Sequence, residues 1–194
     1  MPLTRRGDGT VIATVPFHTG LPDEEREKTT YLHVFDYTGK LLFKKHIVDE
    51  TSAVDVSRNG SLIATTIKER VSDMHTRAVV YDKQGEVFFI SDVMEYDSPL
   101  DGMSKKEIWA VQVSDDNKLL AYGDTAGMVW LMDMEADKIL WSEFCGGQVR
   151  KLGFDKQDSV LYVSAGDGYL RCFSASDGSL IWETYVDAWI TKWT

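Results

Sequence analysis

The residues that could do chemistry gather in three irregular stretches, 16–29, 68–77 and 92–106. These stretches hold two of the four histidines, with acidic and aromatic side chains close by. The candidates for binding are His18, Asp23, Glu24, Glu25, Arg70, His75, Glu95, Tyr96 and Asp97. Imidazoles and carboxylates are ligands of Zn²⁺ and Ca²⁺, but no spacing here matches a known ligand pattern. We therefore expect no metal or cofactor at these residues, and a surface that binds a protein or peptide.

Catalytic signatures are missing from the sequence. GxSxG and GxGxxG do not occur, and the acidic segment 92–101 lacks the D-x-D-x-D-G spacing of an EF-hand loop. The GDG at 166–168 lies between two apolar runs and no helical pattern follows it, so we interpret it as a β-turn and not as a phosphate cradle. The sequence therefore favours an interaction module over an enzyme.

Composition narrows the choice of partners. The chain has 194 residues and a net charge of −10, which argues against binding to nucleic acid because that requires a surplus of Lys and Arg. No secretory signal and no apolar run long enough to span a membrane is present, so we expect a cytoplasmic protein. Cys145 and Cys172 form no CxxC motif, and we expect two free thiols.

The elements that must position these residues are short strands in a repeat. Two tight turns recur in each of four units. The first turns are RGDG (6–9), SRNG (57–60), SDDN (114–117) and DKQD (155–158); the second are YTGK (37–40), KQGE (83–86), EADK (135–138) and SDGS (176–179). Strands flank each turn, which gives four strands per unit, designated A to D. The second turns are 46, 52 and 41 residues apart, and a propeller blade takes about 40–45.

Segments 34–43 (VFDYTGKLLF) and 80–89 (VYDKQGEVFF) resemble the end of a WD40 repeat, with Phe35-Asp36 and Tyr81-Asp82 in place of Trp-Asp. The third and fourth units are similar to quinoprotein (PQQ-like) propeller repeats. Their A-x-D-x-x-x-G-x-x-x-W pattern is met in part by Asp133 with Trp141, and by Gly178 with Trp182. Both resemblances imply an all-β propeller of four four-stranded antiparallel blades, at about 1–50, 51–106, 107–147 and 148–188 of one domain. A PQQ-binding or degenerate dehydrogenase propeller is the alternative function that they imply.

All three insertions fall in connections that lie at the same rim of the predicted sheets. The first and second units are longer between strands B and C, and 92–106 lengthens the D–A connection that follows the second unit. In antiparallel sheets the B–C and D–A connections share one rim, while the A–B and C–D turns share the other. Loops on a rigid scaffold are where binding residues concentrate, so this rim is the predicted functional surface.

The chain finishes with AWITKWT, which has the pattern of a further A strand, whereas 1–6 (MPLTRR) has a poor strand pattern. This asymmetry predicts strand exchange, with Trp189, Ile190 and Trp193 completing the first blade. Three closures fit: a small four-bladed ring, a two-chain ring formed by a homo-oligomer, or a larger propeller completed by other sequence. Trp141 and Trp182 are one blade apart, and we expect both to pack between blades.

Overall fold

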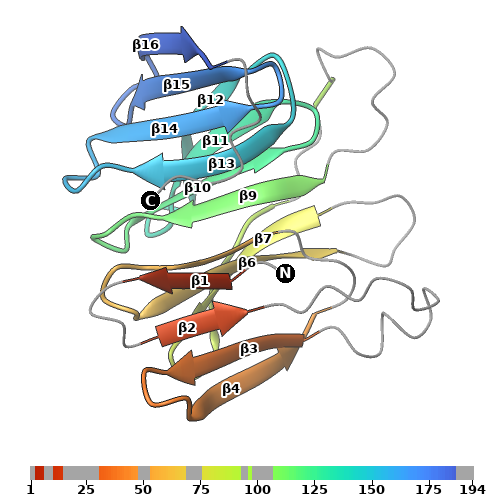
Figure 1. Cartoon of the computed structure of the whole chain (residues 1–194), viewed down its shortest axis with the longest axis vertical. Coiled ribbons are helices and arrows are strands. Elements are labelled where there is room, and N and C mark those ends of the chain that lie inside the picture. Colours follow the sequence, from red (N-terminus) through yellow and green to blue (C-terminus); the bar gives the residue numbers. More distant parts are fainter. Residues whose placement is uncertain are drawn as a thin grey trace. The chain divides into compact units, whose positions relative to one another are not determined.

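The computed structural model describes residues 3–6, 11–14, 31–47, 53–68, 76–92, 96–97 and 107–186. They form four four-stranded sheets, each built from consecutive antiparallel strands (Figure 1). The first sheet contains β1 (Leu3–Arg6), β2 (Val11–Thr14), β3 (Tyr31–Asp36) and β4 (Leu41–His46); the second contains β5 (Val54–Val56), β6 (Leu62–Lys68), β7 (Thr76–Asp82) and β8 (Val87–Ile90). The third contains β9 (Ile108–Val113), β10 (Leu119–Asp124), β11 (Met128–Asp133) and β12 (Lys138–Phe144); the fourth contains β13 (Val149–Phe154), β14 (Val160–Ala165), β15 (Tyr169–Ser174) and β16 (Leu180–Tyr185). The expected all-β architecture of four four-stranded sheets is confirmed.

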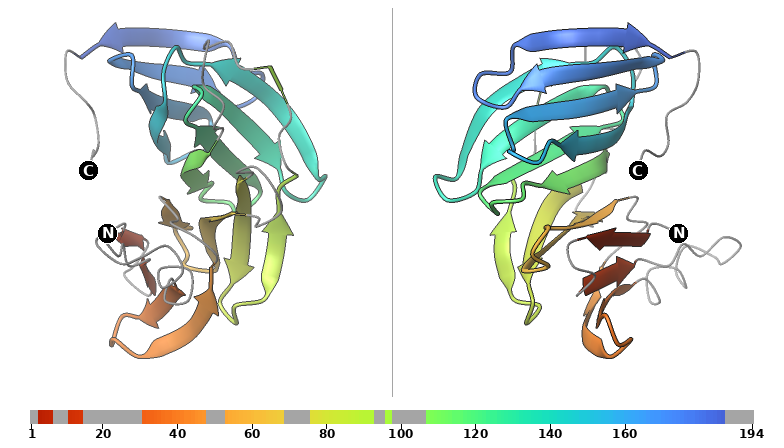
Figure 2. Two further views of the ribbon diagram at one scale, coloured as in Figure 1. Left: turned by 90° about the vertical axis from the view of Figure 1, so that its right-hand side faces the viewer. Right: turned by 60° about the vertical axis from the view of Figure 1, so that its left-hand side comes forward.

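The chain divides into two compact units, residues 1–94 and 95–194. Unit 1 holds the first and second sheets, and unit 2 holds the third and fourth. Within unit 2 the neighbouring A strands β9 and β13 lie side by side (Figure 2). The turns after these strands are also joined, because the carboxylate of Asp158 accepts hydrogen bonds from the backbone N–H groups of Asp115 (2.9 Å) and Asp116 (3.0 Å).

The tight turns lie where the sequence predicts them. The third residue of every second turn has a positive φ: Gly39 (86°), Gly85 (80°), Asp137 (49°) and Gly178 (75°). Glycine takes this left-handed conformation without a steric cost, and Asp tolerates it better than most residues.

The aspartate that ends strand C stabilises the turn that follows. Oδ1 of Asp36 accepts the N–H groups of Thr38 (2.9 Å) and Lys40 (3.0 Å). Asp82 and Asp133 make equivalent bonds to their own turns. These hydrogen bonds explain why a D follows the apolar run in three of the four repeats.

Every D strand carries a β-bulge at the same place. The pairing shifts by one residue between Val34 and Phe35 in the first sheet, and at the equivalent step in the other three. The residue after each bulge faces an apolar residue of strand C; these four residues are Phe43, Phe89, Trp141 and Trp182. Bulges commonly change the direction of a side chain. Here an aromatic side chain follows the bulge at the same position in all four sheets.

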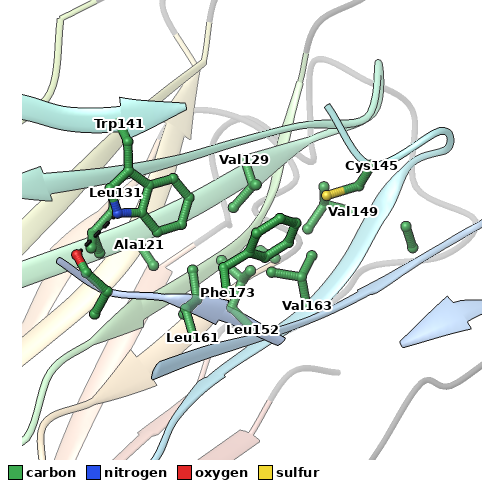
Figure 3. Close-up of a cluster of buried hydrophobic side chains, with 13 residues drawn as sticks. Ala121, Val129, Leu131, Trp141, Cys145, Val149, Leu152, Leu161, Val163 and Phe173 are labelled. Atoms are coloured by element: carbon green, nitrogen blue, oxygen red, sulfur yellow. Dashed lines mark hydrogen bonds between the residues drawn. The ribbon is translucent and has the colours of Figure 1, made fainter. Parts of the chain in front are cut away.

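In unit 2 this aromatic residue joins two sheets. Trp141 of β12 is buried among residues of both sheets, including Leu131 from the third and Leu161 and Phe173 from the fourth (Figure 3). Its ring centroid is 5.9 Å from that of Phe173. Its Nε1–H donates to the carbonyl oxygen of Ala175 at 3.0 Å. The expected packing of Trp141 between sheets is confirmed.

Two expectations from the sequence are wrong. Leu3–Arg6 is a paired strand, since β1 is in register with β2 at four positions. Strand propensity depends strongly on context, so a pattern with two arginines does not prevent pairing. Trp182 is not covered by another sheet: it is 41% exposed, whereas Trp141 is 8% exposed.

Candidate functional site

The rim that carries the B–C turns and D–A connections is described best in unit 2. There it comprises the B–C turns 125–127 and 166–168, the D–A connection 145–148, and residues 96–97. Backbone hydrogen bonds join the two B–C turns to the D–A connection. Cys145 N–H donates to the Gly127 carbonyl (2.8 Å), and Gly166 N–H donates to the Gln148 carbonyl (2.8 Å). We name this set of segments the long-loop rim of unit 2.

The structure describes two of the nine predicted binding residues. Tyr96 is half-buried and Asp97 is exposed. The other seven lie outside the described residues, and so do the three predicted closure residues; these are His18, Asp23, Glu24, Glu25, Arg70, His75, Glu95, Trp189, Ile190 and Trp193. Their roles stay predictions.

Tyr96 is held by Asp124, the last residue of β10. The phenol O–H of Tyr96 donates to Oδ2 of Asp124. The other carboxylate oxygen, Oδ1, accepts the N–H of Met128 at 2.9 Å, across the B–C turn. Asp124 is almost fully buried, and a buried carboxylate is stable only when its oxygens are hydrogen-bonded. One carboxylate therefore fixes both the turn and the segment around Tyr96.

Aromatic rings complete this anchor. The ring of Tyr96 meets Trp130 edge-on, with centroids 5.4 Å apart, and Trp130 stacks on Tyr122 at 5.3 Å. Burial raises the pKa of Asp124 above its ordinary value, and the hydrogen bond from Tyr96 counteracts part of that rise. Burial and the neighbouring Asp124 carboxylate raise the pKa of Tyr96, which keeps its phenol a hydrogen-bond donor.

A second polar cluster surrounds Arg171 of β15. Its guanidinium donates to both carboxylate oxygens of Asp167 (3.2 and 2.5 Å) and to Oε2 of Glu183 (3.1 Å). It also donates to the carbonyl of Cys145 (2.9 Å), which belongs to the D–A connection of the preceding sheet. The planar donors of Arg suit such multiple bonds. Arg171 therefore fixes a turn, a strand and a connection at the same rim.

Two tyrosines extend this cluster to the surface. The Arg171 guanidinium lies 5.0 Å from the ring centroid of Tyr169, within the range of a cation–π contact. The ring of Tyr185 lies 5.3 Å from that of Tyr169 and is 59% exposed. The rim thus presents a rigidly supported aromatic side chain next to the Glu183 carboxylate.

Cys145 and Cys172 are free, buried thiols. Burial raises the pKa of Cys145 to about 12, and burial also raises the pKa of Cys172. A thiol must be deprotonated to act as a nucleophile, so neither thiol is suited to catalysis at neutral pH.

Tyr96 was predicted from the sequence, whereas Asp124, Asp167, Arg171 and Glu183 were not. Asp124 carried a detectable signal: an Asp at the end of an apolar strand, three residues before a Gly, is typical of a carboxylate that binds its own turn. The Arg171 cluster carried no such signal, because Glu183 and the Cys145 carbonyl are far from Arg171 in sequence and reach it only when the strands pair.

Two absences hold for the described part of the chain. No group of three or more His, Cys, Asp or Glu side chains there could hold a metal ion. No helix there is long and apolar enough to cross a membrane.

Comparisons with known proteins agree with this architecture. A family model described as the anaphase-promoting complex subunit 4 WD40 domain matches residues 111–193. A search of curated proteins finds no match. Among solved structures, the chain is similar to the crystal structure of the computationally designed Ika8 protein, with a TM-score of 0.65 and 16% identity over 94% of this chain.

The match covers 48% of the designed protein, so this chain spans about half its length. The quinoprotein part of the resemblance stays a prediction. Domains of the WD40 kind are typically scaffolds for protein interactions and are generally non-catalytic. The four bulged, four-stranded sheets and these matches show a β-propeller fold, and residues 111–193 of the chain are similar to a WD40 domain.

Proposed function

We propose that this protein is a non-catalytic interaction module that binds a protein or peptide partner through its long-loop rim. The observation that carries the proposal is Tyr185, which is exposed at the rim but held by Tyr169 and the Arg171 cluster. Tyrosine supplies a large amphipathic contact surface with few rotatable bonds and is enriched among residues that dominate binding energy. A pre-ordered tyrosine loses little conformational entropy on binding.

Charge favours a basic partner segment. Glu183 offers a carboxylate beside Tyr185, and Asp97 is exposed at the same rim. The chain as a whole carries a net charge of −10. Opposite charge on a partner would speed encounter and select the correct partner.

The test is affinity capture with tagged protein, followed by quantitative mass spectrometry. We expect Tyr185→Ala to lose a defined set of partners while the far-UV circular dichroism and the melting temperature stay unchanged. The matched control is Val87→Ala at the opposite, C–D end of β8, because Val87 is 58% exposed and Tyr185 is 59% exposed. Equal capture by wild type, Tyr185→Ala and Val87→Ala would overturn the proposal for this rim.

The acidic side chains of Asp23, Glu24 and Glu25 in the inserted segment 16–29 are proposed to contribute to the binding of the same partners. The triple change of these three residues to Ser should then weaken capture of the same partners. Glu135→Ser, in a C–D turn at the other rim, is the control for loss of negative charge. If the triple variant captures the same partners as wild type, segment 16–29 is not part of the binding site.

A further inference from the structure

The aromatic residues that follow the D-strand bulges of the first and third sheets have the same kind of neighbour, a turn glycine of the next sheet in their own unit. In unit 2, Trp141 covers Gly178 in the second turn of the next sheet; a Cβ on Gly178 would lie 2.8 Å from Cγ of Trp141. In unit 1, Phe43 covers Gly85 in the same way, and a Cβ there would lie 2.9 Å from its ring. Each docked ring also meets an aromatic residue near the end of strand C: Phe173 for Trp141, and Tyr81 for Phe43 at 6.2 Å.

These contacts define a docking pair with two halves. The knob is the aromatic residue after the bulge, and the socket is the turn glycine with the strand-C aromatic residue of the following sheet. The pair occurs twice with different side chains, Phe on Gly in unit 1 and Trp on Gly in unit 2. The position, and not the identity of the ring, is therefore what the repeat preserves.

The fourth sheet has a knob that is not buried. Trp182 pairs with Cys172 across the bulge of β16, just as Trp141 pairs with Leu131 across the bulge of β12. Trp182 touches Tyr162 of its own sheet, with ring centroids 6.1 Å apart. Yet it is 41% exposed, about five times as much as Trp141. A large exposed aromatic surface on a strand face marks an interaction site or a liability for aggregation.

The first sheet has a socket that is not filled. Gly39 has the positive φ of Gly85 and Gly178, but within the described part of the chain no atom lies within 4 Å of the place where its Cβ would be. Phe35 stands where Tyr81 and Phe173 stand, paired with the first residue of strand D. The neighbouring Tyr37 side chain is strongly exposed.

We propose that Trp182 of one copy of this chain docks on Phe35 and Gly39 of a second copy. The indole N–H then donates to the carbonyl of Tyr37, which is the counterpart of the Ala175 carbonyl in unit 2. Within its described residues each chain has one exposed knob and one unfilled socket, so two chains satisfy both in a closed two-fold assembly. This self-complementarity, with two working examples inside the chain, is why the occupant is a second copy and not an unrelated protein.

The inference does not depend on the binding role of the long-loop rim. Side chains alternate between the two faces of a strand, so Trp182 lies on the face of β16 opposite to Glu183 and Tyr185. Phe35 and Gly39 belong to the first sheet. It also differs from strand exchange, because docking joins side chains on two sheet faces and requires no added strand.

The test measures mass in solution by light scattering over a dilution series. Wild type is expected to have the mass of two chains, and both Trp182→Lys and Phe35→Asp the mass of one, with the Kd of the dimer raised at least about 100-fold. Leu140→Lys is the matched control, since Leu140 lies on β12, is also 41% exposed and is not a knob; it should remain a dimer. Circular dichroism checks that each variant is folded, and Trp182→Ala provides a milder second knob variant.

Mixing the two variants provides the decisive test. A Trp182→Lys chain retains an intact socket, and a Phe35→Asp chain retains an intact knob. An equimolar mixture should therefore form a heterodimer, whereas neither variant dimerises alone. A wild-type monomer at every concentration would overturn the proposal, as would a dimer that survives both substitutions or a mixture that stays monomeric. A wild-type complex with a different polypeptide at the socket would also overturn it, because the occupant would not be a second copy.

Discussion

The indole N–H of Trp141 donates to the carbonyl oxygen of Ala175, 3.0 Å away in the neighbouring sheet. The same ring covers Gly178, which has no side chain to obstruct it. A hydrogen bond, an apolar ring and a glycine therefore form one joint between two sheets. Because this joint has counterparts elsewhere in the repeat, its parts can be tested against matched positions.

Trp141→Ala should destabilise unit 2 by about 3–5 kcal/mol, because it removes a large buried side chain and leaves a cavity between the sheets. Trp141→Phe should cost less, since it retains most of the apolar contact but leaves the Ala175 carbonyl without this donor. Urea denaturation monitored by far-UV circular dichroism measures both. A cost for Trp141→Ala no larger than that of Leu140→Ala would contradict the role of Trp141 as a joint.

Gly178→Ala should destabilise by more than Gly39→Ala. Both positions have a positive φ, so both substitutions incur a backbone cost of about 1–2 kcal/mol. Only at Gly178 does the added methyl group also meet a ring, 2.8 Å from Cγ of Trp141. The comparison is best made in a Trp182→Lys background, where the proposed docking on Gly39 is removed. Equal melting temperatures for the two alanine variants would show that the ring contact is unimportant.

Tyr96→Phe should raise the pKa of Asp124 further, because burial raises it already and the lost hydrogen bond had lowered it. The pKa of an unfolded Asp is about 3.9. A carboxyl group whose pKa is higher in the folded protein contributes stability that is fully present when the pH is below about 3.9. The contribution is lost as the pH rises through the folded pKa. The variant should therefore lose about 1–3 kcal/mol at neutral pH and less in acid.

Carbon-13 NMR titration of the Asp124 carboxyl group measures the pKa, and urea denaturation at several pH values measures the stability. Asp124→Asn is the control, since it removes the charge that Tyr96 stabilises. The effect of Tyr96→Phe should lose its pH dependence in that background; an unchanged pH dependence would point to another titrating group.

Cys145 should resist thiol reagents in the folded protein. Burial raises its pKa to about 12, so almost no thiolate is present near pH 8, whereas an unperturbed thiol has a pKa of about 8.5. Any stability from this shift is present below about pH 8.5 and is lost as the pH rises toward 12. In a Cys172→Ala variant, labelling should be slow until denaturant is added. Rapid labelling of the native variant would contradict the burial of Cys145.

The tight turns were predictable from the sequence because each depends on a local conformation. Gly39, Gly85 and Gly178 mark left-handed positions. Asp36 and Asp82 accept hydrogen bonds from backbone N–H groups of the turns that directly follow them. The burial of Trp141 was predictable too, since a Trp one blade away from another at an equivalent position suggested packing between sheets. Local signals of this kind repeat, so comparing four copies strengthens each one.

What the sequence could not provide depends on distant residues. Trp141 and Trp182 have the same local pattern, but only Trp141 has a following sheet within its unit, so the same reasoning was right for one and wrong for the other. Arg171 gave no warning because Asp167, Glu183 and the Cys145 carbonyl converge only after three elements pair. The strand at Leu3–Arg6 was underestimated because pairing uses backbone groups that the side-chain pattern does not reveal.

The winding of each sheet from four consecutive strands also affects how the protein is made. Nearly all pairings join strands that are neighbours in sequence, so little chain entropy is lost before contacts form, and such topologies fold comparatively fast. Unit 1 uses only residues 1–94 for its own contacts. We therefore expect it to acquire its sheets while the ribosome is still synthesising unit 2.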